Sequence, residues 1–490
     1  MKYENLSIEQ LHELLKNKKF TVTELTQAVL KNAKKYSNEN FLVTSCDELA
    51  LKNAKKLDNN FELDNLLFGI PYMMKDNLAT KGIKTTASSK ILSNFIPTYN
   101  ATVFDSLNQV QSIMIGKTAL DELGMGGTGL LAATGIITNP RNSKHQVGGS
   151  SSGSAWAVAK GIVPFATGTD TGDSIRKPAS YNGIVGYKPT YGAISRFGLL
   201  PYAPSLDHVG FFTRNVNDMA ILADASISLD SKDLTSMPIA EKDFFKNLNN
   251  FNSKNKFGYI IEIHEALPKD LKTAYDNFFK KLREAGVSVE GVHFKKELLQ
   301  TIPSVYMMIS FSEAVSQSSN LNGINFTNRI DGKDYAEIMT KTRSQLFGPI
   351  VKRRFLVGSF QLKRENQELL LEKAKKVRRL IAQELKKIYN EIDILILPPA
   401  IDVAPKIDTK KILDLEDNAD DDLEFINDIL ILANFNGMPS ITIPFIEKNN
   451  LPIGINFSCA PLKDQKLLQA AKFVENIIGI KDRIAGDNHE

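Results

Sequence analysis

Apolar residues recur at helical spacing near the start of the chain, and this periodicity predicts helices over residues 7–59. Ser7 and Gln10 form a candidate capping box ahead of the first apolar run, and the same periodicity returns over residues 21–33. The chain is therefore expected to begin with a helical part, residues 1–60.

The pattern then changes to short apolar runs. The run LLFGIPYMMKDN is broken by Gly69 and Pro71, which predicts a buried strand followed by a turn. The segment SIMIGKTAL, residues 112–120, predicts a strand that leads into a helix. Glycines are dense over residues 134–215 and helical periodicity is weak there outside 154–159, so we expect long ordered loops, which often carry function.

The second half of the chain alternates strands with helices. This alternation predicts a mostly parallel sheet that is covered by helices on both faces. The charged segment 410–425 predicts an exposed loop. The predicted elements are a strand–helix–strand unit at 257–294, long helical stretches at about 304–320 and 344–391, strands at 393–398 and 439–445, and a closing strand–helix pair.

Composition changes this picture little. Of the 490 residues, 42% are hydrophobic and 24% are charged, which is ordinary for a globular protein. The length suits either about three domains of roughly 150 residues or one large α/β unit. The formal net charge of +4 comes from 60 basic and 56 acidic residues, and this balance does not by itself indicate a nucleic-acid-binding protein.

Targeting and redox signals are weak. Cys46 and Cys459 are the two cysteines, too few for a disulfide framework or a cysteine-rich metal site. No secretory signal precedes the first helix, and no apolar run approaches the roughly 18 residues of a membrane-spanning helix. We therefore expect a cytoplasmic protein that makes no membrane contact.

The segment VGGSSSGSA, residues 147–155, is the first candidate for chemistry. It runs directly into Trp156 and a packed helical pattern, unlike a flexible linker. It lacks the lysine that a phosphate-binding P-loop requires after its last glycine. A glycine-rich turn and a catalytic loop both remain open on this pattern alone.

The segment GTDTGDSIRKPAS, residues 168–180, is the second. Its glycine-rich turn precedes Ser174 and Arg176, and consecutive backbone N–H groups at such a turn can converge on an anion. Ser174 could instead serve only as a helix N-cap.

Lys75 is the third candidate, because it follows an apolar run and lysines are rarely buried without a role. Pairing with Asp76, or an exposed turn, is the alternative. The sequence contains no HExxH zinc motif and no GxSxG elbow, so a hydrolase would need a base other than a motif histidine, and Lys75 is available.

Together these three segments resemble the amidase signature family. GIPYMMKDN is similar to its lysine motif, GGSSSGSA to its serine motif and GTDTGDSIRKPAS to its second serine motif. The order and the spacing agree as well, with 75 residues from Lys75 to Ser150 and 24 from Ser150 to Ser174. Further segments, which include residues 186–210, VKRRFLVGSF and NDILILANFNGMPSITIP, resemble the A subunits of tRNA-dependent amidotransferases over nearly the whole chain.

The resemblance implies a mixed, twisted α/β sheet with helices on both faces, in a single domain over residues 1–490 with a signature core at about 62–215. It also implies a triad in which Ser174 is the nucleophile, Ser150 passes the proton through a cis peptide and Lys75 is the base. A lysine can act as that base only when neutral, so its pKa of about 10.4 must fall to near neutrality.

The substrate implied by the resemblance is glutamine. Backbone N–H groups of Thr171, Gly172 and Asp173 would hold the oxyanion. Arg354 would bind the α-carboxylate, Asp428 the α-ammonium, and Tyr306 would line the pocket. A surface ion pair is the alternative for Arg354 and for Asp428.

The resemblance further implies a heterotrimer. This chain would hydrolyse glutamine without a bound cofactor or metal, and a B subunit would use ATP and magnesium with the ammonia to convert Glu-tRNA(Gln) to Gln-tRNA(Gln). A small C subunit would join the two, and the tRNA would be bound mainly by the B subunit. The alternatives are a stand-alone amidase and a catalytically inactive structural subunit.

Two departures from the family pattern bear on these alternatives. Asp173 replaces a glycine directly before the proposed nucleophile, and its carboxylate could repel a developing oxyanion. The segment GGTGLL, residues 126–131, also differs from the family's version of a loop expected near the active site and the partner subunit.

Overall fold

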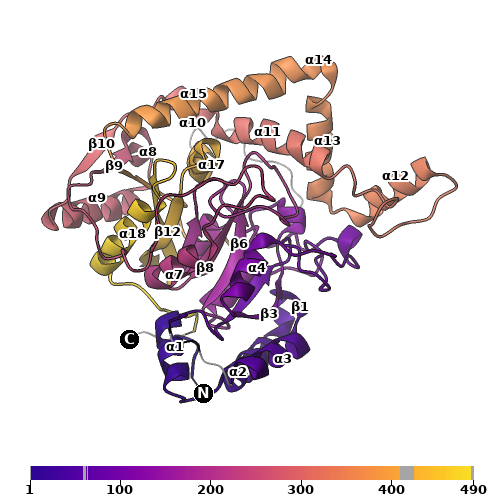
Figure 1. The fold of residues 1–490 in the computed structure, drawn as a ribbon. Helices are drawn as coiled ribbons and strands as arrows, with labels where there is room; N and C mark the ends of the chain where they lie inside the picture. The colour runs from indigo at the N-terminus through magenta and orange to yellow at the C-terminus, as the bar shows by residue number, and fades with distance from the viewer. Residues whose placement is uncertain (1, 59–61, 63, 409–423, 487–490) are drawn as a thin grey trace.

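An 11-stranded sheet runs through the described part of the computed structural model, residues 2–58, 62, 64–408 and 424–486 (Figure 1). Helices pack on both faces of this sheet. In spatial order, the strands are β1 (Leu42–Ser45), β3 (Ile113–Thr118), β2 (Pro71–Lys75), β6 (Phe165–Asp170), β8 (His208–Thr213), β7 (Val185–Lys188), β12 (Ser440–Lys448), β13 (Leu451–Cys459), β11 (Ile394–Leu397), β9 (Phe257–Ile260) and β10 (Val289–Val292).

The sheet is mixed, as the resemblance implied, and the prediction of a mostly parallel sheet is wrong. Parallel pairs lie toward the two ends, in β3–β2–β6 and β11–β9–β10. Every pairing between β6 and β11 is antiparallel within the described residues. One cause is the two-residue connection of β12 to β13, where Asn449 and Asn450 both have positive φ, as a tight antiparallel hairpin requires.

Eighteen α-helices occur in the described residues. The predicted capping box at Ser7 with Gln10 is present, and the structure shows a second one at Thr21 with Glu24. The helices are α1 (Ile8–Lys16), α2 (Val22–Lys35), α3 (Asp47–Leu57), α4 (Thr102–Gln109), α5 (Ser152–Ala159), α6 (Arg176–Asn182), α7 (Val216–Ser226), α8 (Ile261–Glu265), α9 (Lys269–Glu284), α10 (Lys296–Gln300), α11 (Ile302–Gln317), α12 (Tyr335–Leu346), α13 (Pro349–Gln361), α14 (Arg364–Gln367), α15 (Lys373–Ile388), α16 (Glu424–Asn427), α17 (Leu432–Asn436) and α18 (Asp464–Ile478).

Three sequence predictions need correction or restriction. The N-terminal part is not wholly helical, because β1 pairs antiparallel with β3. Residues 134–215 contain the predicted ordered loops, but these alternate with α5, β6, α6, β7 and β8. The predicted loop at 410–425 lies almost wholly outside the described residues. The predicted unit at 257–294 is confirmed, with β9 parallel to β10 and α9 between them, although the first strand ends early, at α8.

The core explains why the serine-rich segment is ordered. Trp156 on α5 is buried and stacks on Phe41 with ring centroids 4.4 Å apart. Helix α5 packs against β2 and β6, so the residues just before it are held beside the sheet.

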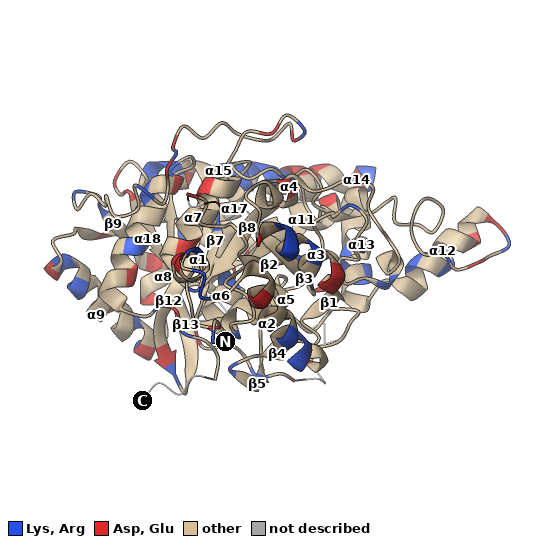
Figure 2. Ribbon diagram, turned by 60° about the horizontal axis from the view of Figure 1, so that its bottom comes forward, with Lys and Arg blue, Asp and Glu red and all other residues tan. Residues whose placement is uncertain are grey.

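The surface carries both charge signs. Figure 2 shows ribbon segments of basic residues (blue) and acidic residues (red) along outer helices such as α9 and α15. Among the helices that the structure describes, none is long and apolar enough to cross a membrane.

Candidate active site

The order of the strands brings the three motifs together. β2 and β6 are parallel neighbours, so their carboxyl ends meet at one edge of the sheet. Lys75 is the last residue of β2, and Ser174 follows the end of β6 by four residues. Ser150 lies just before α5, which packs on both strands.

Lys75 is fully buried among hydroxyl groups. Its Nζ lies 2.9 Å from Ser150 Oγ, 2.8 Å from Ser151 Oγ and 2.7 Å from Thr169 Oγ1. Burial lowers the pKa of Lys75 to about 7, against the opposing effect of the more distant acids. The alternative of pairing with Asp76 is wrong, because Asp76 pairs with the buried Lys117, at 3.4 Å.

Ser150 is held by its backbone. The peptide bond between Gly149 and Ser150 is cis. The carbonyl of Ser150 accepts a hydrogen bond from the Asp121 N–H at 3.2 Å, and the Gly149 N–H donates to the Gly127 carbonyl at 2.9 Å. A Cβ at Gly149 would lie 2.1 Å from Asp121 Oδ2, so residue 149 must be glycine.

The loop at 126–131 lies beside Ser150, as predicted. The buried carboxylate of Asp121 accepts hydrogen bonds from the backbone N–H groups of Thr128, Gly129 and Leu131, at 3.0–3.1 Å. Asp121 therefore ties this loop to the peptide that carries Ser150. Sequence reasoning did not identify this residue.

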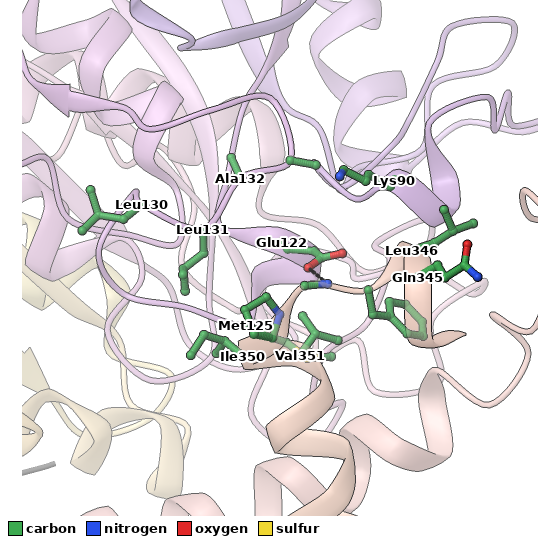
Figure 3. Close-up of a pocket in the computed structure, with 14 residues that line it drawn as sticks. Lys90, Glu122, Met125, Leu130, Leu131, Ala132, Gln345, Leu346, Ile350 and Val351 are labelled. Carbon is green, nitrogen blue, oxygen red and sulfur yellow. Dashed lines mark hydrogen bonds between the residues drawn. The ribbon is translucent and has the colours of Figure 1, made fainter. Parts of the chain in front are cut away.

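A cavity of about 330 Å³ lies between residues 130–133, at the end of this loop, and the start of α13 (Figure 3). The Glu122 side chain reaches from one wall of this cavity to the other, at Gly348. Its Oε2 accepts the N–H of Gly348 at 2.8 Å, and its Oε1 accepts the hydroxyl of Ser89 at 2.5 Å. The neighbouring acids Asp121 and Glu122 thus hold two different parts of the site.

Ser174 is nearly buried and lies in a turn that Arg176 closes. The guanidinium of Arg176 binds both carboxylate oxygens of Asp170, at 2.9 and 3.0 Å, and the Gly172 carbonyl at 2.7 Å. The N-cap alternative for Ser174 is wrong, because α6 begins after Ile175 without a side-chain cap. In this state the Ser174 hydroxyl donates no hydrogen bond to any described residue, including Ser150.

The turn also presents unpaired donors. Among the described residues, none accepts a hydrogen bond from the backbone N–H groups of Thr171, Gly172, Asp173 or Ser174. Such a run of N–H groups is suited to binding an oxyanion. Asp173 does not have a positive φ, so the backbone there does not require glycine, and its carboxylate forms an ion pair with Lys177.

Tyr306 and Arg354 approach this turn from α11 and α13. A Cβ at Gly172 would lie 3.2 Å from the Tyr306 hydroxyl, so the ring covers the turn closely. Arg354 Nη1 donates to the Tyr202 hydroxyl at 2.7 Å, and its guanidinium lies over the rings of Tyr202 and Phe311. The surface ion-pair alternative is wrong for Arg354, which is held among aromatic rings.

Asp428 is close enough to Lys177 to act on its charge. Lys177 Nζ donates to the carbonyl of Asn427 at 2.8 Å and pairs with Asp173. Burial lowers the pKa of Lys177, but the carboxylates of Asp173 and Asp428 outweigh this effect and raise it above its usual value. Lys177 thus connects Asp173 to the backbone just before Asp428.

Besides Asp121, sequence reasoning missed the side chains of Ser151, Thr169, Tyr202 and Lys177 at this site. Ser151 and Thr169 belong to the two serine motifs, and that membership was the one available signal for their contacts with Lys75. Tyr202 carried no local signal, because its partner Arg354 is 152 positions away. Lys177 lies four residues after Asp173, a spacing that favours ion pairs, but this pair was not identified from the sequence.

A family model, related sequences and a solved structure all indicate the same protein family for this chain. The amidase family model matches residues 24–468. The A subunit of glutamyl-tRNA(Gln) amidotransferase from Mycoplasma genitalium is 42% identical over 422 residues, covering 85% of this chain and 87% of that protein. Its counterpart from Streptococcus thermophilus is 38% identical over 480 residues, covering 97% and 96%. The crystal structure of the counterpart from Thermotoga maritima has a TM-score of 0.78 at 31% identity, covering 97% and 95%. This chain therefore belongs to the amidase family.

Proposed function

We propose that this chain is the glutaminase subunit of a tRNA-dependent amidotransferase. The observation that carries the proposal is Lys75, a fully buried lysine with a pKa lowered to about 7 and an Nζ 2.9 Å from Ser150 Oγ. A lysine that is partly neutral near pH 7 can accept a proton from a serine hydroxyl.

In the proposed reaction, Lys75 takes the proton of Ser150, and Ser150 takes that of Ser174. The Ser174 oxygen attacks the side-chain amide carbon of glutamine. The unpaired N–H groups of Thr171, Gly172 and Asp173 stabilise the negative charge that develops on the amide oxygen. The relay then returns the proton to the leaving nitrogen, ammonia departs, and water hydrolyses the γ-glutamyl ester.

Three further residues would hold glutamine. Arg354 would bind the α-carboxylate through the planar donor fork of its guanidinium, with Tyr306 lining the pocket. Asp428 would bind the α-ammonium. The rings of Tyr202 and Phe311 under Arg354 support this role, because they fix the guanidinium without neutralising it.

The ammonia would pass to a partner. The 38–42% identity to A subunits of glutamyl-tRNA(Gln) amidotransferase supports a complex with B and C subunits. In that complex, the B subunit would use ATP and magnesium to amidate Glu-tRNA(Gln), and this chain would bind no cofactor. The same identity favours this function over a stand-alone amidase.

Covalent labelling tests the nucleophile. An aryl sulfonyl fluoride reacts with activated serines, so we expect it to label Ser174 and to inactivate ammonia release from glutamine in parallel. Ser174→Ala should remove the label, and Lys75→Met should slow labelling at least ~100-fold. Ser154→Ala is the matched control, because this buried serine of the same motif is hydrogen-bonded to Thr118 and is not among the hydroxyl partners of the Lys75 ammonium. Labelling that persists in Ser174→Ala would refute the assignment.

A further inference from the structure

Asp207 lies opposite the turn at residues 171–174, which carries the unpaired N–H groups and is called the oxyanion turn below. Strands β6 and β8 are antiparallel, with Asp170 paired to His208. Thr171, which follows β6, and Asp207, which precedes β8, therefore meet at the edge of the sheet. The Thr171 hydroxyl donates to Asp207 Oδ1 at 2.6 Å. Asp207 is only 2% exposed, so this hydrogen bond is shielded from water.

The second oxygen of the same carboxylate holds a different part of the site. Asp207 Oδ2 accepts the backbone N–H groups of Tyr202 and Ala203, at 2.9 and 3.0 Å, and so closes the loop that runs from Tyr202 to β8. The Tyr202 hydroxyl accepts Arg354 Nη1 at 2.7 Å and donates to Ser310 Oγ at 3.0 Å. One buried carboxylate therefore connects the oxyanion turn to the tyrosine that holds Arg354.

These two connections bear on the length of the substrate. In the proposed function, the oxyanion turn binds the oxygen of the side-chain amide and Arg354 binds the α-carboxylate. The two groups must then lie one glutamine side chain apart, because a small displacement of the reacting carbon from Ser174 slows the attack strongly. Asparagine is one methylene shorter, so it cannot reach both groups at the same spacing.

We propose that Asp207 is a positioning residue that selects the length of the amide substrate, because it fixes the oxyanion turn relative to Tyr202 and Arg354. The proposal rests on the proposed glutaminase function. Asp207 acts through Thr171 on one side and through Tyr202 on the other, and not by contact with the substrate. Loss of either connection should let the spacing between the two substrate-binding groups vary, and glutamine should lose its advantage over shorter amides.

Thr171→Val cuts the connection at one end. Valine has nearly the size of threonine and keeps the backbone N–H, but its side chain cannot donate to Asp207. Ammonia release by the complex with its B and C partners gives kcat/KM for glutamine and for asparagine, and the ratio of the two is the preference for glutamine. A missing methylene typically changes kcat/KM by about 10- to 200-fold. We expect Thr171→Val to lower the preference at least about fivefold.

Two substitutions test Asp207 itself. Asp207→Leu removes all three hydrogen bonds and should lower the preference at least as much as Thr171→Val. Asp207→Asn can keep them, because its amide oxygen can accept both N–H groups while its amide nitrogen donates to the Thr171 hydroxyl. Its preference should therefore lie closer to the wild-type value than to that of Asp207→Leu.

Thr190→Val is the matched control for the loss of a buried hydroxyl. The Thr190 hydroxyl also donates to a buried carboxylate, that of Asp464, at 2.5 Å. This pair does not join the oxyanion turn to Tyr202, so Thr190→Val should leave the preference within about twofold of wild type. Circular dichroism would check that each variant is folded.

A double-mutant cycle with glutamine alone gives a second measurement, which does not depend on the turnover of asparagine. Thr171→Val should lower kcat/KM for glutamine at least about tenfold in the wild-type background. In the Arg354→Ala background the spacing to Arg354 no longer matters, so the further loss should be less than about threefold. Equal losses for glutamine and asparagine, or the same loss in both backgrounds, would overturn the inference.

The same experiments separate this inference from the function on which it rests. If the wild-type complex releases no ammonia from glutamine, the proposed function fails and this inference with it. If the wild-type complex is active but Thr171→Val leaves the preference unchanged, only the inference fails.

Discussion

Lys75 donates to three hydroxyl groups, and none of the described carboxylates forms an ion pair with it. The acids that act on it, first among them Asp121, raise its pKa, but the loss of hydration outweighs them. The neighbouring Lys117 is equally buried but lies 3.4 Å from Asp76. Lys75, whose partners are hydroxyl groups, is therefore a candidate base, whereas Lys117 belongs to a structural ion pair.

The pH dependence of catalysis follows from this environment. The base must be neutral, so kcat/KM for glutamine should rise with pH and level off above an ionisation at about 7. Below that ionisation, activity should fall about tenfold per pH unit. Steady-state kinetics from about pH 5.5 to about 8.5 would measure the profile. A flat profile over this range would contradict the assignment of Lys75 as the base.

Both the charge of Arg354 and the paired N–H donors of its guanidinium should contribute to binding the carboxylate of glutamine. Arg354→Ala should lower kcat/KM for glutamine by at least tenfold, because removing one partner of a buried charge pair costs about 2–5 kcal/mol. Arg354→Lys should recover only part of this loss, since an ammonium cannot bind a carboxylate bidentately. Arg353→Ala, about 100° around the same helix, is the control and should change kcat/KM less than threefold. Equal effects of the two alanine variants would contradict the carboxylate site.

At the scale of elements, the adjacent acids Asp121 and Glu122 hold two separate segments. Asp121 holds the loop that contacts the Gly149–Ser150 peptide, whereas Glu122 holds Gly348 at the start of α13, the helix that carries Arg354 (Figure 3). The two side chains should therefore act on different kinetic constants.

Asp121→Asn should lower kcat at least tenfold with little change in KM, because an amide cannot accept all three backbone N–H bonds and Ser150 would shift. Glu122→Gln should mainly raise KM, because it loosens the start of α13. Steady-state kinetics with glutamine, with circular dichroism as the check on folding, would measure both. Identical changes in kcat and KM for the two variants would show that both acids act only on stability.

The family resemblance, and not the spacing of residues by itself, singled out Lys75, Ser150 and Ser174. The structure brings their three motifs together at the carboxyl ends of β2 and β6. β1 is a strand of four residues and has too few positions to show a period of two. Helix α8 follows β9 without a break in apolar character, so the end of that strand was not predictable.

Contacts across the fold were not predictable in the same way. The bond from Arg354 to Tyr202 joins residues 152 positions apart, and no local pattern encodes it. The direction of the central strands depended on turns such as Asn449–Asn450, whose significance appears only when both strands are known.

In the whole molecule, hydrogen bonds join the start of the N-terminal helix α1 to α7 and to Arg214, which directly follows β8. Asp218 on α7 accepts the N–H of Ile8 at the start of α1, at 3.0 Å. Arg214 donates to the carbonyl of Leu6, at 2.7 Å. We therefore predict that residues 1–490 form one domain and that calorimetry of the isolated chain will show one unfolding transition. Separate melting of the N-terminal part would contradict this prediction.

Asp218 should also make stability depend on pH. Burial raises the pKa of its carboxyl to about 8 in the folded state, above its unfolded value. The protonated carboxyl therefore stabilises the folded state fully below its unfolded pKa. This contribution to the free energy of unfolding is lost progressively as the pH rises to about 8. Tm should therefore fall by about 3–5 °C more between about pH 5 and about pH 9 in the wild type than in Asp218→Asn. Parallel Tm profiles for the two proteins would contradict the raised pKa.

In the proposed function, Ser174 releases ammonia for a reaction on another subunit. Amidation of Glu-tRNA(Gln) by the Ser174→Ala complex, supplied with either glutamine or an ammonium salt, tests this division between subunits. We expect loss of the glutamine-dependent reaction, with the ammonium-dependent reaction within about twofold of wild type. Glutamine-dependent amidation by Ser174→Ala, or failure with ammonium in a complex that remains assembled, would contradict it.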